Sequence, residues 1–170
     1  MFGIRPGWSM LTGAVVVPAI EQAGFTHVIW IPDSHFGTWD DHLSSSKKLM
    51  LIRATREGEA VALGAGLLIG EAKPLVVIQC TGFFEAGDAV RNVVHDLRMP
   101  LKIIVGVRSW RASQQGKSAD NCPSFAEPLI QAWKLPYRWF EPFTSTEPDC
   151  AKLFEELAQS SEAHAVLWGE

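Results

Sequence analysis

The 170-residue sequence lacks several features that mark particular classes of protein. It has only three cysteines, Cys80, Cys122 and Cys150, which lie far apart and form no Cys-x-x-Cys pair. This pattern suggests neither a disulfide framework nor a zinc site, and it fits a reducing cytoplasm. No apolar run approaches the roughly 18 to 20 residues that cross a bilayer. We therefore expect a cytoplasmic protein without a membrane partner.

An excess of positive charge is also missing. The chain has 15 basic and 19 acidic residues, a net charge of −4, and no long run of either sign. Nucleic-acid-binding proteins usually carry a basic patch or stripe. The composition therefore favours a small-molecule or protein partner over nucleic acid.

Several well-known functional motifs are absent. There is no phosphate-binding Gly-x-x-x-x-Gly-Lys loop and no Gly-x-Ser-x-Gly elbow. Gly64, Gly66 and Gly70 fall inside an expected helix, whereas a dinucleotide fingerprint needs its glycines in the turn before the helix. We interpret them as positions where the helix approaches a neighbour closely. "GDA" at Gly87 lacks the spaced asparagine of a metal and diphosphate motif.

What the sequence does contain is an alternation of apolar strands and helices. Strands are expected at 27–32, 49–53, 74–80, 101–107, 137–140 and 164–168. Helices are expected at 13–23, within 33–46, and at 57–70, 85–99, 125–133 and 148–160, with a polar loop at 108–123. Strands that are apolar throughout are typical of a parallel sheet covered on both faces. The pattern predicts one three-layer, doubly wound α/β domain over residues 1–170, with a mainly parallel sheet.

In such folds, ligands bind beyond the carboxyl ends of the strands. The loops after Pro32, Arg53, Cys80 and Val107 are therefore candidate site loops. The stretch "TREGEAVALGAGLLIGEAKPLVVIQCTG", from Thr55 to Gly82, touches two of them. It places Glu57 and Glu59 at the start of an apolar helix, where by residue pattern alone they are interpreted as carboxylates that favour the helix dipole.

Four sequence pieces, taken in order, carry a family resemblance. They are "IPDS", "TREGEAVALGAG", "KPLVVIQCTG" and "MPLKIIVGVRSWR", which span about Val28 to Arg111. They resemble the pyrimidine-binding domain of thiamine-diphosphate-dependent decarboxylases, most closely the sulfopyruvate and phosphonopyruvate decarboxylase group. In that group the pieces carry Pro-Cys-Ser, Asn-Glu-Gly-Glu-Ala-Val, Gln-Asn-Ser-Gly and Ser-Trp-Arg.

The resemblance implies a pyrimidine-binding domain and a catalytic role for Glu57. Its carboxyl group would hydrogen-bond the aminopyrimidine of thiamine diphosphate and so help to generate the cofactor's nucleophilic carbon. The residues expected to bind the cofactor are Glu57, Gln79, Thr81 and Gly82. For Glu59 the residues suggest no role beyond the helix dipole.

The resemblance also implies a heteromeric enzyme. A chain of this length holds one such domain, so we expect an α subunit of a 2-oxoacid decarboxylase whose β subunit supplies the diphosphate site and Mg²⁺. No metal ligand is expected in this chain. Two alternatives stay open: carbon–carbon cleavage or ligation of aromatic 2-hydroxy ketones, and a noncatalytic regulatory subunit of the same fold.

The substrate side departs from the group's pattern. After "SWR" the group carries an acidic stretch with a histidine, but this chain has "ASQQGKSADNCPSFAEP". Arg108 and Arg111 could hold an anionic substrate or form surface salt bridges, and the pair of phenylalanines after Gly82 could line a pocket or pack the core. The substrate-site candidates are Asp33, Ser34, Phe83, Phe84 and Arg111.

Overall fold

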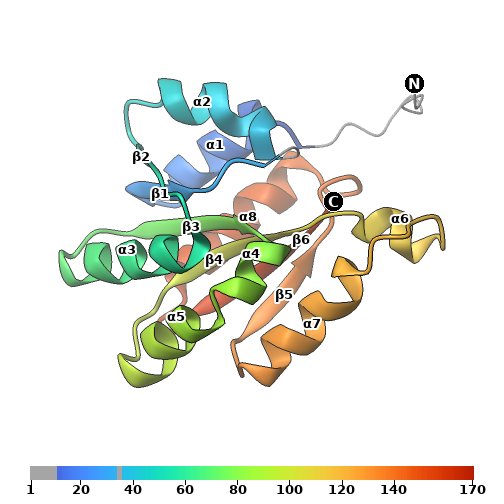
Figure 1. Cartoon of the computed structure of the whole chain (residues 1–170). Coiled ribbons are helices and arrows are strands. Elements are labelled where there is room, and N and C mark those ends of the chain that lie inside the picture. Colours follow the sequence, from blue (N-terminus) through green and yellow to red (C-terminus); the bar gives the residue numbers. More distant parts are fainter. Residues whose placement is uncertain (1–10, 34–35) are drawn as a thin grey trace.

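Six parallel strands form the centre of the protein. The computed structural model describes residues 11–33 and 36–170. The strands are β1 (His27–Trp30), β2 (Met50–Arg53), β3 (Pro74–Gln79), β4 (Lys102–Val107), β5 (Tyr137–Phe140) and β6 (His164–Gly169). They are ordered β2-β1-β3-β4-β6-β5 and every neighbouring pair is parallel, so all the carboxyl ends lie at one edge of the sheet (Figure 1).

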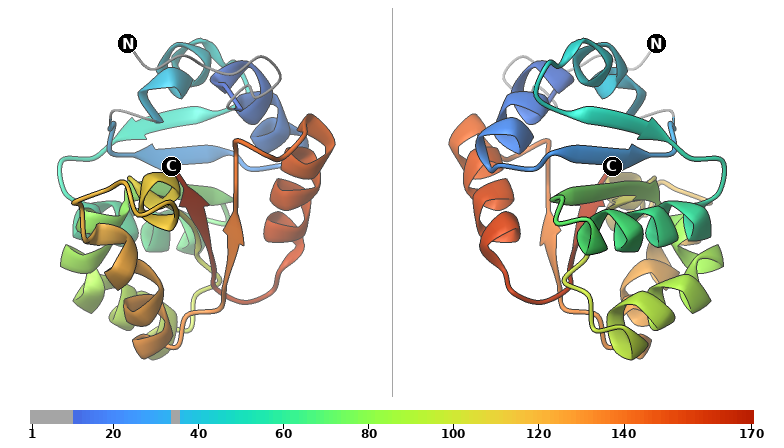
Figure 2. Two further views of the ribbon diagram at one scale, coloured as in Figure 1. Left: turned by 90° about the vertical axis from the view of Figure 1, so that its right-hand side faces the viewer. Right: turned by 90° about the vertical axis from the view of Figure 1, so that its left-hand side faces the viewer.

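Helices cover both faces of this sheet, which confirms the predicted three-layer α/β class (Figure 2). One layer contains α1 (Gly13–Gln22), η1 (Phe36–Trp39), α2 (Asp40–Ser45) and α8 (Glu147–Gln159). The other contains α3 (Glu57–Ile69), α4 (Cys80–Glu85), α5 (Gly87–Arg91), η2 (Asn92–Asp96) and α7 (Cys122–Ala132). Strand β3 shows why two layers are needed, because Leu75 and Val77 enter one hydrophobic core while Val76 and Ile78 enter the other.

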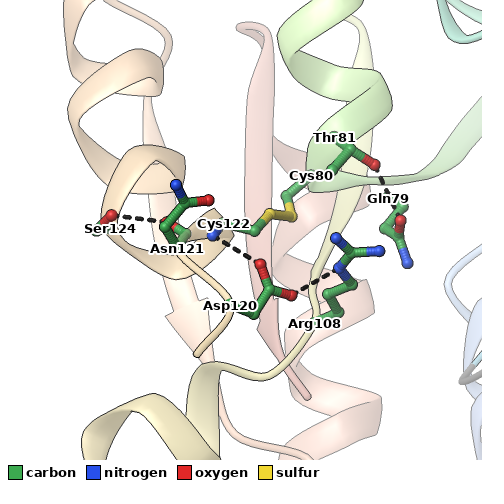
Figure 3. Close-up of a disulfide and its surroundings, with 8 residues drawn as sticks. All are labelled: Gln79, Cys80, Thr81, Arg108, Asp120, Asn121, Cys122 and Ser124. Carbon is green, nitrogen blue, oxygen red and sulfur yellow. Dashed lines mark hydrogen bonds and ion pairs between the residues drawn. A yellow bond between two sulfur atoms is a disulfide. The ribbon is translucent and has the colours of Figure 1, made fainter. Parts of the chain in front are cut away.

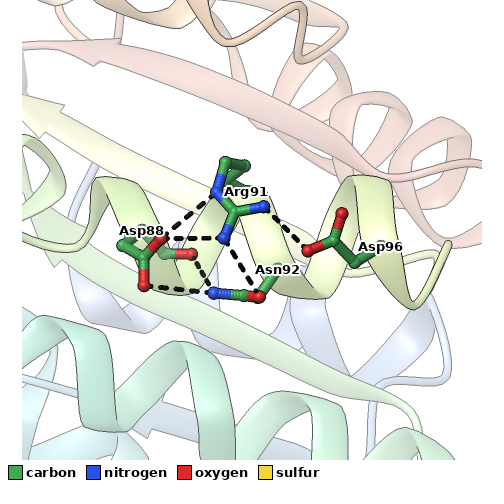
Figure 4. A network of polar contacts seen from close by, with 4 residues as sticks. All are labelled: Asp88, Arg91, Asn92 and Asp96. Carbon is green, nitrogen blue, oxygen red and sulfur yellow. Dashed lines mark hydrogen bonds and ion pairs between the residues drawn. The ribbon is translucent and has the colours of Figure 1, made fainter.

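The helix expected at 85–99 is divided and begins earlier. It starts at Cys80 as α4, breaks near Ala86, continues as α5 and ends in η2, a single π-helical turn. At the break, a Cβ on Gly87 would clash with the ring of Trp133. Arg91 then spans the change of helix type, because its guanidinium pairs with Asp88 at 3.0 Å and Asp96 at 2.7 Å (Figure 4).

The segment expected to be a loop at 108–123 contains a short helix, α6 (Trp110–Gln114). Ser109 has φ +61°, which turns the chain sharply from β4 into α6. Trp110 then packs on Trp139, with ring centroids 4.9 Å apart. A five-residue helix held by a distant tryptophan carries too little periodicity to be read from sequence.

The prediction that the cysteines form no disulfide was wrong. Cys80 and Cys122 form a disulfide across 42 residues of sequence, with their Cα atoms 7.0 Å apart. Both residues begin helices at the carboxyl edge of the sheet, and helices α4 and α7 pack together there. Sequence spacing does not reveal a pairing that the tertiary fold creates. Cys150 is free and buried.

Close approach of α3 to a neighbour was predicted at its glycines, and the structure shows it at Gly64. A Cβ on Gly64 would lie 2.7 Å from Cδ1 of Leu101, so the absence of a side chain lets the helix approach its neighbour. Gly66 has nothing within 4 Å of the same position. In the described ranges, no helix is long and apolar enough to span a membrane.

Candidate functional site

The candidate site lies at the carboxyl edge of the sheet. From β1 the chain adds β2 on one side, and from β3 it continues outward on the other side to β4. Such a change of direction leaves a crevice beyond the strand ends, where α/β proteins bind ligands. The loops after β1, β2, β3 and β4 all reach this edge because the strands are parallel, as the sequence predicted.

Glu57 is the first residue of α3 and packs against the start of α4. Its side chain is half-buried, and a Cβ on the buried Gly82 would overlap its carboxyl group. Only glycine therefore leaves room for this carboxyl position. Glu57 and Gly82 lie 25 residues apart in sequence and belong to two different motifs of the resemblance, and the fold brings them into contact.

Glu59 has a different environment from Glu57. Its Oε2 accepts hydrogen bonds from Thr55 N at 3.0 Å and Thr55 Oγ1 at 2.9 Å, which close the start of α3. These bonds, the backbone one first, lower the pKa of Glu59. Within residues 11–33 and 36–170, the Glu57 carboxylate has no hydrogen-bond or ion-pair partner. Of the two glutamates, only Glu57 keeps its oxygens for a ligand.

Gln79 and Thr81 flank Cys80 where β3 runs into α4. Thr81 Oγ1 donates a hydrogen bond to Gln79 Oε1 at 3.0 Å (Figure 3). Gln79 is half-buried and Thr81 is exposed. Together with Gly82 they line the side of the edge on which Glu57 lies.

Arg108 and Asp120 follow β4, the strand next to β3, and form a second side of this edge. Arg108 Nε donates to Asp120 Oδ2 at 2.8 Å, and Asp120 Oδ1 accepts from Cys122 N at 3.0 Å (Figure 3). The bond from Cys122, with a smaller contribution from Arg108, lowers the pKa of Asp120. Since Cys122 is bonded to Cys80, these contacts run continuously to the start of α4.

The substrate-site candidates lie in several environments. Arg111 stacks over the ring of Phe143, with its Cζ 4.7 Å from the centroid, and its N–H donates to the backbone oxygen of Glu170. Asp33 Oδ1 accepts from Phe36 N at 2.8 Å and caps η1. Ser34 lies outside the described residues.

The two phenylalanines after Gly82 differ in how deeply their side chains are buried. Phe83 is fully buried and packs edge-on against Trp133, with centroids 4.6 Å apart. Phe84 is half-buried. Phe83 therefore belongs to the core between α4 and α7, and only Phe84 retains exposed surface.

Comparisons with known proteins find relatives among decarboxylases. No family model matches the chain. The α subunit of sulfopyruvate decarboxylase from Methanococcus maripaludis is 25% identical over 155 residues, which cover 89% of this chain and 88% of that protein. Phosphonopyruvate decarboxylase from Streptomyces viridochromogenes is 26% identical over 102 residues. The chain is a homologue of these decarboxylases.

The matched segment covers a different share of each relative. The matched segment covers 60% of this chain but only 25% of the phosphonopyruvate decarboxylases from S. viridochromogenes and Streptomyces hygroscopicus. A solved structure from Mycobacterium smegmatis, assigned as a thiamin diphosphate-dependent enzyme, matches with a TM-score of 0.64 at 16% identity. That match covers 95% of this chain and 31% of the other, and it confirms the thiamine-diphosphate-dependent enzyme fold.

Glu170 lies at the candidate site and was not a candidate in the sequence analysis. It follows β6 at the same edge and is only 5% exposed, and neither carboxylate oxygen has a hydrogen-bond partner among the described residues. Burial first, and then the Asp33 carboxylate, raise its pKa to about 8, while Arg108 opposes this shift. The available signal was a glutamate directly after the apolar strand "HAVLWG".

Surface hollows lined by Arg138 and Glu156 lie along β5 and α8. Helix α8 covers the face of the sheet opposite to α3. These hollows are therefore separate from Glu57 and Gly82. Arg138 and Glu156, which line both hollows, pair with each other, and we assign these hollows no ligand.

Proposed function

We propose that the chain is the α subunit of a thiamine-diphosphate-dependent 2-oxoacid decarboxylase. The observation that carries this proposal is the half-buried Glu57 carboxyl lodged on Gly82, at the carboxyl edge of a sheet with this enzyme fold. The near-full overlap with a protein named as a decarboxylase α subunit supports the same reading.

The residues at this edge fit the aminopyrimidine of thiamine diphosphate. Glu57 offers a carboxyl group without a competing partner in the described chain, and Gly82 leaves room for it. Gln79 and Thr81 supply amide and hydroxyl groups beside it. The cofactor, when bound, would supply the electron sink for loss of carbon dioxide. Glu57 would hold or share a proton at a ring nitrogen.

A β subunit would supply the diphosphate site and Mg²⁺. The described residues contain no group of three or more His, Cys, Asp or Glu side chains placed to hold a metal. Leu63 and Ile69 of α3 are 37% and 71% exposed, and a protein partner bound on α3 would cover them.

The substrate would bind between the two sides of the edge. Arg108 lies at the end of β4, where its Nε pairs with Asp120, and its other N–H groups would suit the carboxylate of a 2-oxo acid. Asp33, Arg111 and Phe84 stay candidates for further contacts. The alternative of aromatic 2-hydroxy ketones gains no support, since Phe83 is in the core.

A cytoplasmic location stays a prediction. The disulfide weighs against it, because structural disulfides are rare in reducing compartments. Measuring whether Cys80 and Cys122 are thiols or a disulfide in the native cells would decide between a reducing and an oxidising compartment.

The test is calorimetric titration of thiamine diphosphate with Mg²⁺. The chain alone, and then the chain mixed with a candidate β subunit, would be titrated. We expect binding only in the mixture, followed by release of carbon dioxide from 2-oxo acids. Absence of binding with a partner that forms a stable complex would favour the noncatalytic subunit and overturn the decarboxylase proposal.

A further inference from the structure

The Cys80–Cys122 disulfide joins the two sides of the candidate site. Cys80 lies between Gln79 and Thr81, at the start of the helix that holds Gly82 against Glu57. Cys122 begins α7, and its N–H is bonded to Asp120 (Figure 3). One covalent bond therefore connects the cofactor side to the loop that carries the Arg108–Asp120 pair.

The first part of that loop has attachments of its own, because Trp110 packs on Trp139 and Arg111 N–H bonds the backbone oxygen of Glu170. Residues 114–117 are exposed, and Gly116 turns the chain with φ +65°. The Arg108–Asp120 ion pair is partly exposed, with 45% and 21% of the two side chains accessible to solvent. Ion pairs so exposed hold a segment weakly. The position of the later part of the loop, which carries Asp120, therefore depends on the disulfide.

We propose that the Cys80–Cys122 disulfide is a redox-controlled positioning element for the substrate side of the site. Oxidised, it fixes the Arg108–Asp120 loop against α4. Reduced, it releases the loop and weakens binding of an anionic substrate. The effect on substrate binding rests on the proposed function. The effect of the disulfide on the position of the loop does not.

The redox step is an exchange with a dithiol. A thiolate of the dithiol attacks one protein sulfur and forms a mixed disulfide, and its second thiol then displaces that sulfur. Two electrons pass to the protein, the two protons end on Cys80 and Cys122, and the dithiol becomes a disulfide. Both protein sulfurs belong to buried residues, so the exchange requires the loop to open.

The third cysteine, Cys150, does not form disulfides with Cys80 or Cys122. Cys150 lies in α8, in the core on the opposite face of the sheet from Cys80 and Cys122. Burial raises the pKa of its thiol to about 12, which keeps it protonated and unreactive. The pair can therefore open and close without exchanging partners, and Cys150→Ala serves as the control variant.

The first test measures hydrogen–deuterium exchange of the full chain, oxidised and after treatment with a dithiol, with reduction checked by thiol alkylation. We expect exchange in residues 108–121 to rise about tenfold or more on reduction, with less than about a twofold change in α3 and α8. The double variant Cys80→Ser/Cys122→Ser should match the reduced protein in both conditions. Cys150→Ala should respond as the wild type does. Unchanged exchange in 108–121 after complete reduction would overturn the proposal.

The second test measures turnover of a 2-oxo acid by the complex with its β subunit. Reduction should raise KM about tenfold and leave kcat within about twofold, because the substrate side is loosened and Glu57 is not. Reoxidation should restore KM, and the double variant should not respond to the dithiol. A KM that does not change would overturn the substrate role. Absence of turnover in both redox states would instead remove the proposed function, while the exchange result would still decide whether the disulfide positions the loop.

Discussion

Glu57 is placed by close packing on Gly82, whereas Arg108 and Asp120 lie on a polar loop tied down by a disulfide and a partly exposed ion pair. The first side keeps the motif order of the decarboxylase group, and the second departs from it. Packing fixes the Glu57 carboxyl in one position, as the proposed contact with a cofactor would require. In the later part of the loop after β4, a covalent bond takes the place of such close packing.

Glu57→Gln should have the largest effect. Glutamine keeps the shape but cannot exchange a proton, so turnover of the complex should fall about 10²- to 10⁴-fold. Glu59→Gln, the matched control in the same helical turn, should change turnover less than about threefold, because Glu59 only closes the start of α3. Steady-state kinetics with a 2-oxo acid measures both. Full turnover by Glu57→Gln would remove the role assigned to this carboxyl.

Breaking the disulfide tests how the other side is held. Cys80→Ser/Cys122→Ser should lower the free energy of unfolding by about 2–4 kcal/mol, since the unfolded chain regains the freedom of a long loop. Urea unfolding of the variant should coincide with that of the dithiol-treated wild type. Equal midpoints for the variant and the oxidised wild type would show that the crosslink contributes no stability.

Gly82→Ala should disturb the close packing with little loss of stability. The added methyl overlaps the Glu57 carboxyl, which ends a flexible side chain and can rotate away. We expect a stability cost of about 1 kcal/mol but a fall in turnover of about 10- to 100-fold, because the carboxyl is misplaced. Gly66→Ala is the control, since it has open space and should be neutral or slightly stabilising. Unchanged turnover in Gly82→Ala would show that the contact does not position Glu57.

Glu170→Gln should have the smallest effect, visible as a change in pH dependence. The raised pKa of about 8 means that the folded chain keeps a proton that the unfolded chain loses from about pH 4.5 upward. Wild-type stability should therefore fall, through this group, as the pH rises from about 4.5 to 8. The variant should lack that fall, because glutamine does not titrate.

Unfolding by urea between pH 5 and 8 measures this difference. Glu155→Gln, an exposed position on α8, is the matched control and should follow the wild type. A difference between Glu170→Gln and wild type that does not grow with pH would contradict the assignment of a buried, proton-holding carboxyl.

Much of the fold was predictable because it depends on local patterns. Runs such as "PLVVIQ" and "KIIVGV" are apolar on both faces, so they had to lie in a covered parallel sheet. The boundaries that failed, at Cys80 and at Trp110, lie where the chain contacts partners distant in sequence, Cys122 and Trp139. Propensity carries no information about such partners.

The sequence by itself determined the α/β class, because the alternation of strands and helices is a property of the chain, and its motif order made Glu57 a candidate site residue. Only the tertiary structure decided which glutamate keeps its oxygens for a ligand, that Phe83 is core, that Cys80 meets Cys122 and that Glu170 is buried at the same edge. The physical reason is that burial and pairing depend on residues from other elements, which folding alone brings into contact.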